Sequence, residues 1–434
     1  MSKKIVFIGA GSPYVPAIVH EIAIACNKDM ISEVVFITRT EKNLSTISDF
    51  CTGLFNQQGI YPTITERTSV DDSIQNADMI FLIYRVGGMT ARMSDETIGI
   101  NFDVISQESQ GVGGFSSALR HIALLDVMAD SFKKWAPNAW IVNLTNPTGI
   151  MTYAAEKLGL KSIGICEAPY DLVRKVAEIF SRNDDNIEYD FIGLNHLGWM
   201  IDVHKNNVSL MEEVTKTENL SVLLPKILPK NIILTSDYVK FVQSIQAIPS
   251  SYLPFYYHRD EFILHQKTLK KTRAEEVLEI NDDLYDKFAS KCYGQWPEFF
   301  KQKRSGYLLG EALSSVVSDI LGKSSEQEHI ICFRNGNAIS NISQDAILEM
   351  PVKIINGKIV PKYNEKKLSG NIYTLIAAVS EYEILTVNAA LSGDRKIALE
   401  ALVSHPLIPS IQIAHTLLEK ILDEHMQYLP IFAR

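Results

Sequence analysis

Short runs of apolar residues alternate with stretches of helically spaced apolar residues from Lys3 to about residue 181. A β-branched and aromatic run such as the one over residues 3–8 is typical of a strand that is buried on both faces of a parallel sheet. Repeated strand and helix units predict a doubly wound, Rossmann-like α/β fold. The predicted strands cover residues 3–8, 34–37, 79–84, 140–144 and 162–165, and the predicted helices cover 14–25, 43–57, 115–129, 150–158 and 170–181.

The pattern changes after Asp190, where residues 191–195 and 198–203 predict two antiparallel strands that meet at a turn containing His196. The remainder predicts helices mixed with a small sheet. The helical segments are 207–245, 274–281, 305–321, 368–391, 395–403 and 408–424, and the strands are 329–333, 337–341 and 346–350. Because a chain of 434 residues is too long for one core, we expect an α/β domain over residues 1–190 and an α+β domain over residues 191–434.

The composition is that of an ordinary globular protein, with 46% hydrophobic and 21% charged residues. The net charge of −9 argues against nucleic acid or an anionic membrane as the main partner. No stretch of about 18 apolar residues is present to span a bilayer, and the first apolar run is too short for a signal peptide. Five widely spaced cysteines without a CxxC pair fit a reducing compartment. We therefore expect a cytoplasmic protein.

The first predicted strand runs directly into Gly9-Ala10-Gly11-Ser12, and a predicted helix follows. In this context Gly9 permits a tight turn, Gly11 lets a pyrophosphate approach the backbone, and the helix N-terminus offers free N–H groups. Tyr14 occupies the position of the third glycine in the full fingerprint. The segment predicts a dinucleotide site that includes Gly9, Gly11 and Ser12, against the simpler interpretation of a plain strand-to-helix turn.

The second predicted strand ends in Thr38-Arg39, where a dinucleotide site usually has an acidic residue that binds the ribose hydroxyls. Arg39 is suited either to a 2′-phosphate or to stacking on the adenine. The sequence therefore includes Arg39 in the cofactor site and leaves the choice between NAD and NADP open.

Glycine-rich loops with charged residues follow the third predicted strand. The segments over 85–96 and 107–114 lie beyond its carboxyl end, where open parallel sheets bind ligands. The charged residues Arg92, Glu108 and Arg120 beside this much glycine predict binding loops rather than plain linkers.

Two later strand ends and the His196 turn carry further polar side chains. Asn146 with Pro147 stops one strand and presents an amide upward from the sheet, and the next strand delivers Cys166 and Glu167. Cysteine and histidine are ligands suited to a divalent transition metal, and two protein ligands leave positions open for substrate oxygens and water. By spacing alone, a buried apolar cysteine and a hydrogen-bonded turn histidine remain the alternatives.

Taken in order, these motifs resemble glycoside hydrolase family 4, of the NAD- and Mn-dependent 6-phospho-glucosidase type. The likeness rests on the glycine loop, the RVGG and GxGG segments, NPTG, GxC with a proline three positions later, and GLNHLGW. It continues through Ser251-Tyr252-Leu253, Thr272–Glu276 and His405-Pro406-Leu407, and so covers essentially the whole chain. The resemblance implies a fold similar to that of lactate and malate dehydrogenases, with substrate binding, metal binding and oligomerisation in the second domain.

The resemblance implies hydrolysis of 6-phosphorylated β-glucosides, such as cellobiose 6-phosphate. In the family, NAD takes a hydride from C3 of the sugar, a base removes the C2 proton, and the C1 substituent is eliminated before water and the hydride return. Mn²⁺ or another divalent metal, held by Cys166 and His196, would act as a Lewis acid on the C2 and C3 oxygens. The implied partner is a phosphorylated disaccharide or aryl glycoside, and the family's habit implies a homodimer or homotetramer.

The resemblance also implies roles for single residues. Tyr252 matches the base that removes the C2 proton, although a tyrosine needs a nearby cation to act as a base at neutral pH. Arg92 and Arg273 match residues that bind the sugar 6-phosphate, Asn146 matches a substrate contact, and Glu108 matches a carboxylate near the metal.

Glu167 departs from the family pattern, in which the residue after the cysteine varies with the substrate. That residue is Asn in typical 6-phospho-β-glucosidases, Asp in 6-phospho-α-glucosidases and His in α-galactosidases. A glutamate is suited to be the general acid for the leaving oxygen, a further metal ligand or a contact to a sugar hydroxyl. The anomeric preference is therefore open between α and β, and the remaining motifs favour β.

Two other classes of function remain as alternatives. A 2-hydroxyacid-type NAD dehydrogenase would share the fold, but that class pairs its histidine with an aspartate and needs no Cys–His metal site. A noncatalytic NAD-binding sensor would require the loss of the metal or base positions, yet Cys166, His196 and Tyr252 are all present.

Overall fold

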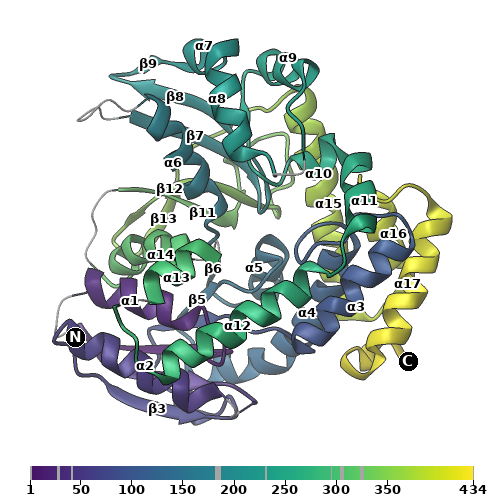
Figure 1. Ribbon diagram of the computed structural model, residues 1–434. Helices are drawn as coiled ribbons and strands as arrows, with labels where there is room; N and C mark the ends of the chain where they lie inside the picture. Colours follow the sequence, from purple (N-terminus) through teal and green to yellow (C-terminus); the bar gives the residue numbers. More distant parts are fainter. Residues whose placement is uncertain are drawn as a thin grey trace.

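The computed structural model describes residues 2–26, 30–40, 43–180, 187–229, 232–294, 296–303, 307–322 and 327–433. Helices surround one continuous sheet, and the two termini lie on opposite sides of the view in Figure 1. The predicted helix positions at residue 181, at residues 230–231 and at residues 305–306 lie outside the described residues.

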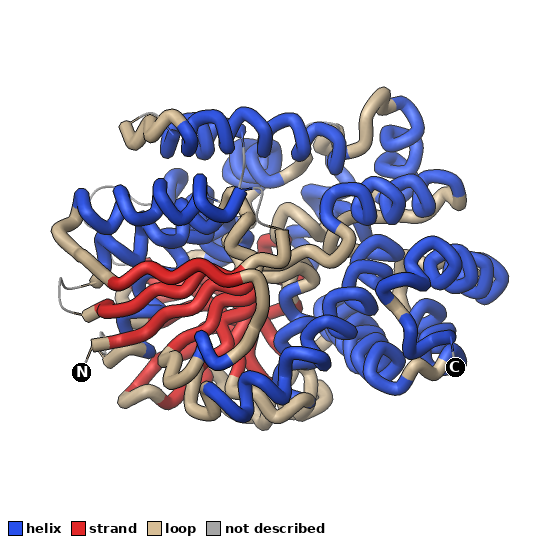
Figure 2. The backbone as a smooth tube through the Cα atoms, turned by 90° about the horizontal axis from the view of Figure 1, so that it is seen from below, coloured by secondary structure: helices blue, strands red, loops and turns tan. Residues whose placement is uncertain are grey.

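The first six strands form a parallel sheet in the order β3-β2-β1-β4-β5-β6, which confirms the predicted doubly wound sheet. In this order, ligands bind at the carboxyl ends of the strands near the point where the order reverses. Figure 2 shows these strands side by side. They are β1 (Lys3–Ile8), β2 (Ile31–Ile37), β3 (Thr63–Arg67), β4 (Met79–Leu82), β5 (Trp140–Asn143) and β6 (Ser162–Gly164). The apolar pattern does not indicate β3, because this strand lies at the sheet edge with no fully buried residue.

Helices pack around this parallel sheet. They are α1 (Val15–Ala25), α2 (Leu44–Gln57), α3 (Gly88–Asn101), α4 (Gly111–Trp135), α5 (Thr148–Lys157) and α6 (Ala168–Phe180).

Two segments that the sequence predicts as loops are helical instead. Residues 91–96 lie within α3, where Arg92, Asp95 and Glu96 are buried. A buried helix face is normally apolar. The spacing of apolar residues therefore does not predict a helix whose buried face is charged. The second segment, residues 111–114, forms the start of α4. A Cβ on Gly113 would lie 2.4 Å from the Gln107 carbonyl oxygen, so glycine serves close packing here and not a flexible loop.

The sheet continues past β6 in the order β6-β11-β12-β7-β8-β10, with β13 beside β12 and β9 beside β8. The predicted antiparallel hairpin is confirmed as β7 and β8. The added strands are β7 (Ile187–Leu194), β8 (Leu197–Lys205), β9 (Val208–Ser209), β10 (Ile248–Pro249), β11 (Glu328–Arg334), β12 (Ile347–Ile355) and β13 (Lys358–Pro361). The proposed domain boundary at residue 190 falls within β7, so the sheet itself joins the two predicted domains.

The predicted strand over 337–341 is wrong. These residues form turns after β11, with one isolated bridge between Ile339 and Lys366. The buried Asn335 amide donates to the carbonyl oxygens of Ile339, Ile342 and Ser343, each at 3.0 Å. The Asn335 side chain thus binds backbone carbonyl groups that would otherwise pair with a neighbouring strand.

Helices of the second half surround the antiparallel part of the sheet, and α12 runs back across the N-terminal half to pack on α2 and α3 (Figure 1). The helices are α7 (Met211–Val214), α8 (Thr217–Ile227), α9 (Ser236–Ile245), α10 (Pro254–Tyr257), α11 (Arg259–Thr268), α12 (Arg273–Ala289), α13 (Trp296–Lys303), α14 (Tyr307–Ile320), α15 (Gly370–Ser392), α16 (Arg395–Ser404) and α17 (Ile411–His425).

The helix α15 is long and apolar enough to cross a membrane by length and composition alone, and half of its apolar window is buried inside the protein. It packs against α4, α5 and α16. Its apolar composition is therefore that of a core helix.

Candidate active site

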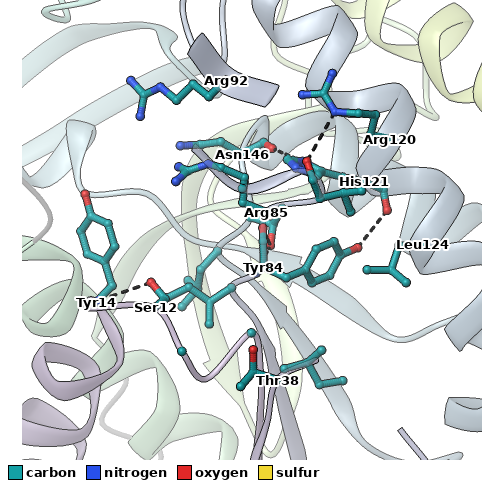
Figure 3. A pocket seen from close by; sticks show the side chains of 18 of the residues that line it. Ser12, Tyr14, Thr38, Tyr84, Arg85, Arg92, Arg120, His121, Leu124 and Asn146 are labelled. Carbon is teal, nitrogen blue, oxygen red and sulfur yellow. Dashed lines mark hydrogen bonds between the residues drawn. The ribbon is translucent and has the colours of Figure 1, made fainter. Parts of the chain in front are cut away.

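A pocket of about 1090 Å³ opens at the carboxyl ends of the parallel strands, and Figure 3 shows part of its wall. Residues from both halves of the chain line it. Every residue that the sequence predicts for the site reaches this pocket: Gly9, Gly11, Ser12, Arg39, Arg92, Asn146, Cys166, Glu167, His196, Tyr252 and Arg273. The fold thus brings all of these positions together.

Cys166 and His196 lie side by side in the pocket wall. Cys166 follows β6, and its Sγ accepts a hydrogen bond from the Ala168 backbone N–H at the start of α6 (3.5 Å). His196 occupies the tight turn between β7 and β8 with a φ of 63°, a conformation rare for residues other than glycine. The His196 Nε2 atom lies 3.2 Å from the Cys166 Sγ atom. Two potential metal donors therefore converge on one point.

Residues at the start of α4 hold His196 in this position. The Ser109 hydroxyl hydrogen-bonds to the His196 Nδ1 atom. The Gln110 amide donates to the His196 carbonyl oxygen (3.3 Å) and accepts from the Tyr256 hydroxyl (2.6 Å). With Nδ1 engaged, Nε2 is the nitrogen that faces the thiol. The sequence does not single out Ser109 and Gln110, and their place directly after Glu108 is the signal that could have found them.

The Tyr252 ring stacks on the His196 imidazole, with ring centroids 3.7 Å apart and planes 6° apart. Tyr252 lies in the turn between β10 and α10. Removal from bulk water, with Cys166 and Glu167 nearby, raises the pKa of its hydroxyl well above the usual range. A tyrosine with such a pKa would act as a base at neutral pH only if a cation offset this effect.

The protonation states of the Cys–His pair fit a metal site. Burial lowers the pKa of His196 to about 3, so the imidazole is neutral with a free lone pair. Burial raises the pKa of the Cys166 thiol, and Glu349 and Glu167 raise it further. A divalent cation overcomes such a shift because it binds the thiolate form. Among the described residues no group of three or more His, Cys, Asp or Glu side chains could enclose a metal, so the pair leaves positions open for other ligands.

A buried carboxyl group lies behind the pair. The Asn195 side chain donates to Glu349 Oε1 (3.4 Å) and accepts from the Thr148 backbone N–H (3.2 Å). The Cys332 thiol donates to the same oxygen of Glu349 at 3.5 Å. Burial raises the pKa of Glu349 to about 8, so this carboxyl group is mostly protonated at neutral pH. The sequence does not reveal Glu349, because a lone glutamate within an apolar strand forms no motif.

Arg92 reaches the pocket from α3 and is bound by two carboxylates. Its Nε donates to Glu96 at 2.9 Å, and its Nη1 donates to Glu108 at 2.7 Å. Arg85 also pairs with Glu108. Figure 3 shows Arg85, Arg92 and Asn146 extending toward the same side of the pocket.

Arg273 reaches the pocket from the start of α12. Its Nη1 atom pairs with Glu276 at 2.8 Å, and 47% of its side chain is exposed. The neighbouring Ala274 N–H donates to Glu96 Oε2 at 3.0 Å, which links α12 to the carboxylate that also binds Arg92. The two arginines thus belong to helices that are tied together at this pocket.

A fully paired ion network supports the same wall. Asp95 of α3 accepts bonds from Arg120 (2.6 and 3.1 Å), from the Ser116 hydroxyl (2.6 Å) and from His425 Nε2 (2.8 Å). Although burial opposes it, His425 and Arg120 lower the pKa of Asp95 below its ordinary value. Arg120 also donates to the Val86 carbonyl oxygen (3.4 Å), as Figure 3 shows. The network ties α3, α4 and α17 to the loop that follows β4.

The glycine loop forms the opposite side of the pocket. Gly9 has a φ of 93°, and a Cβ there would lie 2.5 Å from the Ile83 carbonyl oxygen, so only glycine fits. A Cβ on Gly11 would make only ordinary contacts with Thr38, at 3.5 Å or more. The Gly11 carbonyl oxygen accepts from the Tyr285 hydroxyl of α12 at 2.7 Å. The loop is thus fixed by the protein while its outer side remains accessible.

Asn146 lies in the loop between β5 and α5 with its side chain at the pocket. Its Oδ1 accepts from the Thr148 hydroxyl at 3.2 Å, and its carbonyl oxygen bonds to His121 Nδ1 at 2.8 Å. Tyr84 donates in turn to the His121 carbonyl oxygen at 3.0 Å. These bonds fix the strand end that carries the amide.

Comparisons with known proteins identify one family over nearly the whole chain. The model of the Family 4 glycosyl hydrolase matches residues 4–181, and that of the Family 4 glycosyl hydrolase C-terminal domain matches residues 191–408. The 6-phospho-beta-glucosidase BglT of Thermotoga maritima is 31% identical over 435 residues, which covers 99% of this chain and 100% of that protein.

Solved structures agree with these matches. The 6-phospho-beta glucosidase from Thermotoga maritima with manganese, NAD⁺ and glucose-6-phosphate aligns with a TM-score of 0.86 at 28% identity, covering 98% of this chain and 99% of that one. A lactate dehydrogenase from Eimeria maxima, with NADH and oxamate, gives a TM-score of 0.52 at 16% identity over 90% and 96% of the two chains. This second likeness concerns the fold alone and confirms the predicted fold class. The chain belongs to the family 4 glycosyl hydrolases and is a glycosidase.

Proposed function

We propose that this chain hydrolyses 6-phosphorylated β-glucosides, such as cellobiose 6-phosphate or a phosphorylated aryl glycoside. The observation that carries the proposal is the convergence of Cys166, His196 and Tyr252 in a pocket that also includes the glycine loop. The likeness to a 6-phospho-β-glucosidase supports the choice of substrate.

Two bound groups complete the proposed site. Gly9, Gly11 and Ser12 would hold NAD, which would supply reversible hydride acceptance, and Cys166 and His196 would hold Mn²⁺ or another divalent metal, which would supply Lewis-acid charge. The neutral imidazole and the displaceable thiol proton described above fit such a metal.

Tyr252 and Glu167 carry the proton transfers in this proposal. Tyr252 removes the C2 proton, and because its ring stacks on His196, a cation held by His196 would lower the pKa of the Tyr252 hydroxyl. Glu167 lies at the start of α6, directly after Cys166, and protonates the leaving oxygen at C1. The alternative roles for Glu167 are a further metal ligand or a contact to a sugar hydroxyl.

Arg92, Arg273 and Asn146 bind the phosphorylated sugar. The two guanidinium groups offer charge-assisted hydrogen bonds to a 6-phosphate, and Asn146 offers an amide to a hydroxyl. Arg92 already contacts Glu96 and Glu108. A phosphate therefore shares the Arg92 guanidinium with two carboxylates. The Arg273 guanidinium is more exposed and, among the described residues, pairs with one carboxylate, that of Glu276.

The substrate assay compares α- and β-linked p-nitrophenyl glucosides and galactosides, each with and without a 6-phosphate. We expect release of p-nitrophenol from the β-glucoside 6-phosphate only when NAD and Mn²⁺ are both present. No NADH accumulates, because the hydride returns in every turnover. The unphosphorylated β-glucoside is expected to react about 100-fold more slowly or worse, because the arginines then lose their partner.

Other outcomes of this assay contradict the proposal in distinct ways. Faster release from the α-glucoside 6-phosphate would show an α-specific enzyme and contradict the proposed β preference. Steady NADH formation from a 2-hydroxyacid would instead show a dehydrogenase. In D₂O the sugar product is expected to carry deuterium at C2. Tyr252→Phe should lose this exchange while Tyr257→Phe, whose hydroxyl bonds to Asn371 away from the pocket, retains it.

Ser109→Ala is expected to weaken Mn²⁺ binding by about 10- to 100-fold, because the His196 ring loses the partner that orients it. Nucleotide affinity should stay unchanged. Mn²⁺ titration followed by electron paramagnetic resonance measures the Mn²⁺ affinity, and calorimetry measures the nucleotide affinity. Ser131→Ala is the control, since Ser131 lines the pocket from the far end of α4, the helix that follows Ser109. An unchanged Mn²⁺ affinity in Ser109→Ala would remove Ser109 from the site.

We also propose that the protein is cytoplasmic and forms a homodimer or homotetramer. The free cysteines of the described chain, Cys166 included, fit the reducing cytoplasm. Exposed apolar side chains on the C-terminal helices, such as Val403 and Ile411, favour a homodimer or homotetramer built through residues 191–434. Sedimentation velocity tests the assembly directly, and a monomer at micromolar concentration would contradict it.

A further inference from the structure

The carboxyl end of β2 lies directly beside the glycine loop. The backbone N–H groups of Gly9 and Ala10 both donate to the Ile37 carbonyl oxygen, at 2.8 and 3.0 Å. Thr38 is the next residue, and its hydroxyl lies 3.5 Å from the position of a Cβ on Gly11. In a dinucleotide-binding fold this strand end meets the adenosine ribose of the cofactor, whose pyrophosphate lies on the glycine loop.

This end of the pocket is lined by hydroxyl groups, one amide and one cation: Thr38, Arg39, Thr40, Asn43, Thr68 and Ser69. Among the described residues that line the pocket, the carboxylates are Glu108 and Glu167. Glu108 binds Arg92, and Figure 3 shows Arg92 and Thr38 at opposite ends of the view. No described acidic residue therefore faces the site of the ribose hydroxyls.

Arg39 is available to a ligand. It is exposed, lines the pocket, and forms no hydrogen bond or ion pair with any described residue. The carboxylate of Asp71, two residues from Ser69, is occupied by the Ser69 hydroxyl (3.3 Å) and the Ser73 backbone N–H (2.8 Å). Asp71 does not line the pocket and forms no ion pair with Arg39.

We infer that the cofactor site accepts a dinucleotide with a phosphate on the 2′-position of its adenosine ribose, NADP(H), at least as well as NAD. Arg39 provides the charge-assisted contact to the 2′-phosphate, and the surrounding threonine and serine hydroxyls provide neutral donors. An acidic residue at this strand end would repel that phosphate, and the exchange of acid for Arg39 removes the repulsion. The inference rests on the proposed dinucleotide binding and adds the identity of its adenosine end.

The test measures binding without sugar or metal, by calorimetry at low and at physiological salt. The ligands are NAD⁺, NADP⁺ and the fragments 5′-ADP and 2′,5′-ADP, which isolate the adenosine end. We expect NADP⁺ to bind at least as tightly as NAD⁺, and 2′,5′-ADP to bind more tightly than 5′-ADP. Arg39→Ala should weaken NADP⁺ and 2′,5′-ADP about ten-fold and leave NAD⁺ and 5′-ADP within about two-fold.

Arg174→Ala is the matched control, because Arg174 is an exposed arginine that does not line the pocket, and it should change neither affinity. NADP⁺ binding ten-fold or more weaker than NAD⁺ would overturn the inference and leave the proposed NAD site intact. An equal loss of both dinucleotides in Arg39→Ala would also overturn it, since Arg39 would then stack on the adenine. Failure of every nucleotide to bind would overturn the proposed cofactor site itself.

Discussion

Cys166→Ser is expected to lower kcat by about a thousand-fold or more and to abolish detectable Mn²⁺ binding. A serine hydroxyl does not become an alkoxide at neutral pH, so the site loses the anionic donor that lies 3.2 Å from His196 Nε2. Without the metal, nothing offsets the raised pKa of Tyr252, and the base is lost together with the Lewis acid. Activity assays and Mn²⁺ titration measure the two losses.

Cys332→Ser provides the control for this variant. Cys332 is equally buried, lies across the β6–β11 pairing and does not line the pocket. A serine there can still donate to Glu349. We expect activity and Mn²⁺ binding within about three-fold of the unaltered protein, with nucleotide binding intact in both variants. Full activity of Cys166→Ser would remove the Cys–His pair from the mechanism.

Arg120→Met is expected to lower the free energy of unfolding by about 3–5 kcal/mol, because it leaves the Asp95 carboxylate buried without its main charged partner. Asp95 is 4% exposed, so water cannot replace the guanidinium. Urea denaturation followed by circular dichroism measures the loss.

Arg395→Met is the matched control, since Arg395 pairs with Glu419 on the surface with about half of each side chain exposed. Arg395→Met should lower the free energy of unfolding by no more than about 1 kcal/mol. Combining Arg120→Met with Asp95→Asn should recover part of the lost stability, because the uncompensated charge is removed. A loss in Arg120→Met as small as that in Arg395→Met would show that His425 and Ser116 satisfy Asp95 by themselves.

The parallel sheet follows from the sequence because its central strands are short, continuous apolar runs that alternate with helically spaced segments. Apolar periodicity fails where an element buries charge or lies at an edge. The helix α3 turns Arg92, Asp95 and Glu96 inward, and β3 is half exposed. The strand predicted over 337–341 fails for another reason, since the Asn335 side chain satisfies the backbone of that segment.

Sequence motifs predict the residues that line the pocket. They do not predict the contacts that orient those residues. Cys166 and His196 stand out by residue type and by their place at strand ends. The bonds from Ser109 and Gln110 depend on how closely α4 packs against the β7–β8 turn, which no local pattern encodes. Glu349 cannot be identified from the sequence for the same reason, because its partners Asn195 and Cys332 come from the β7–β8 turn and from β11.

The strand order has a consequence for synthesis on the ribosome. Cys166 and His196 are 30 positions apart, but β6 and β7, the strands that precede them, are separated in the sheet by β11 and β12. Single pairings, Cys332 with Gly164 and Glu349 with Gly193, make those joins. A nascent chain that ends before Glu328 contains both donors and lacks the strands that hold them in register. At the proposed metal site, binding is therefore expected only after β11 and β12 have been synthesised and paired.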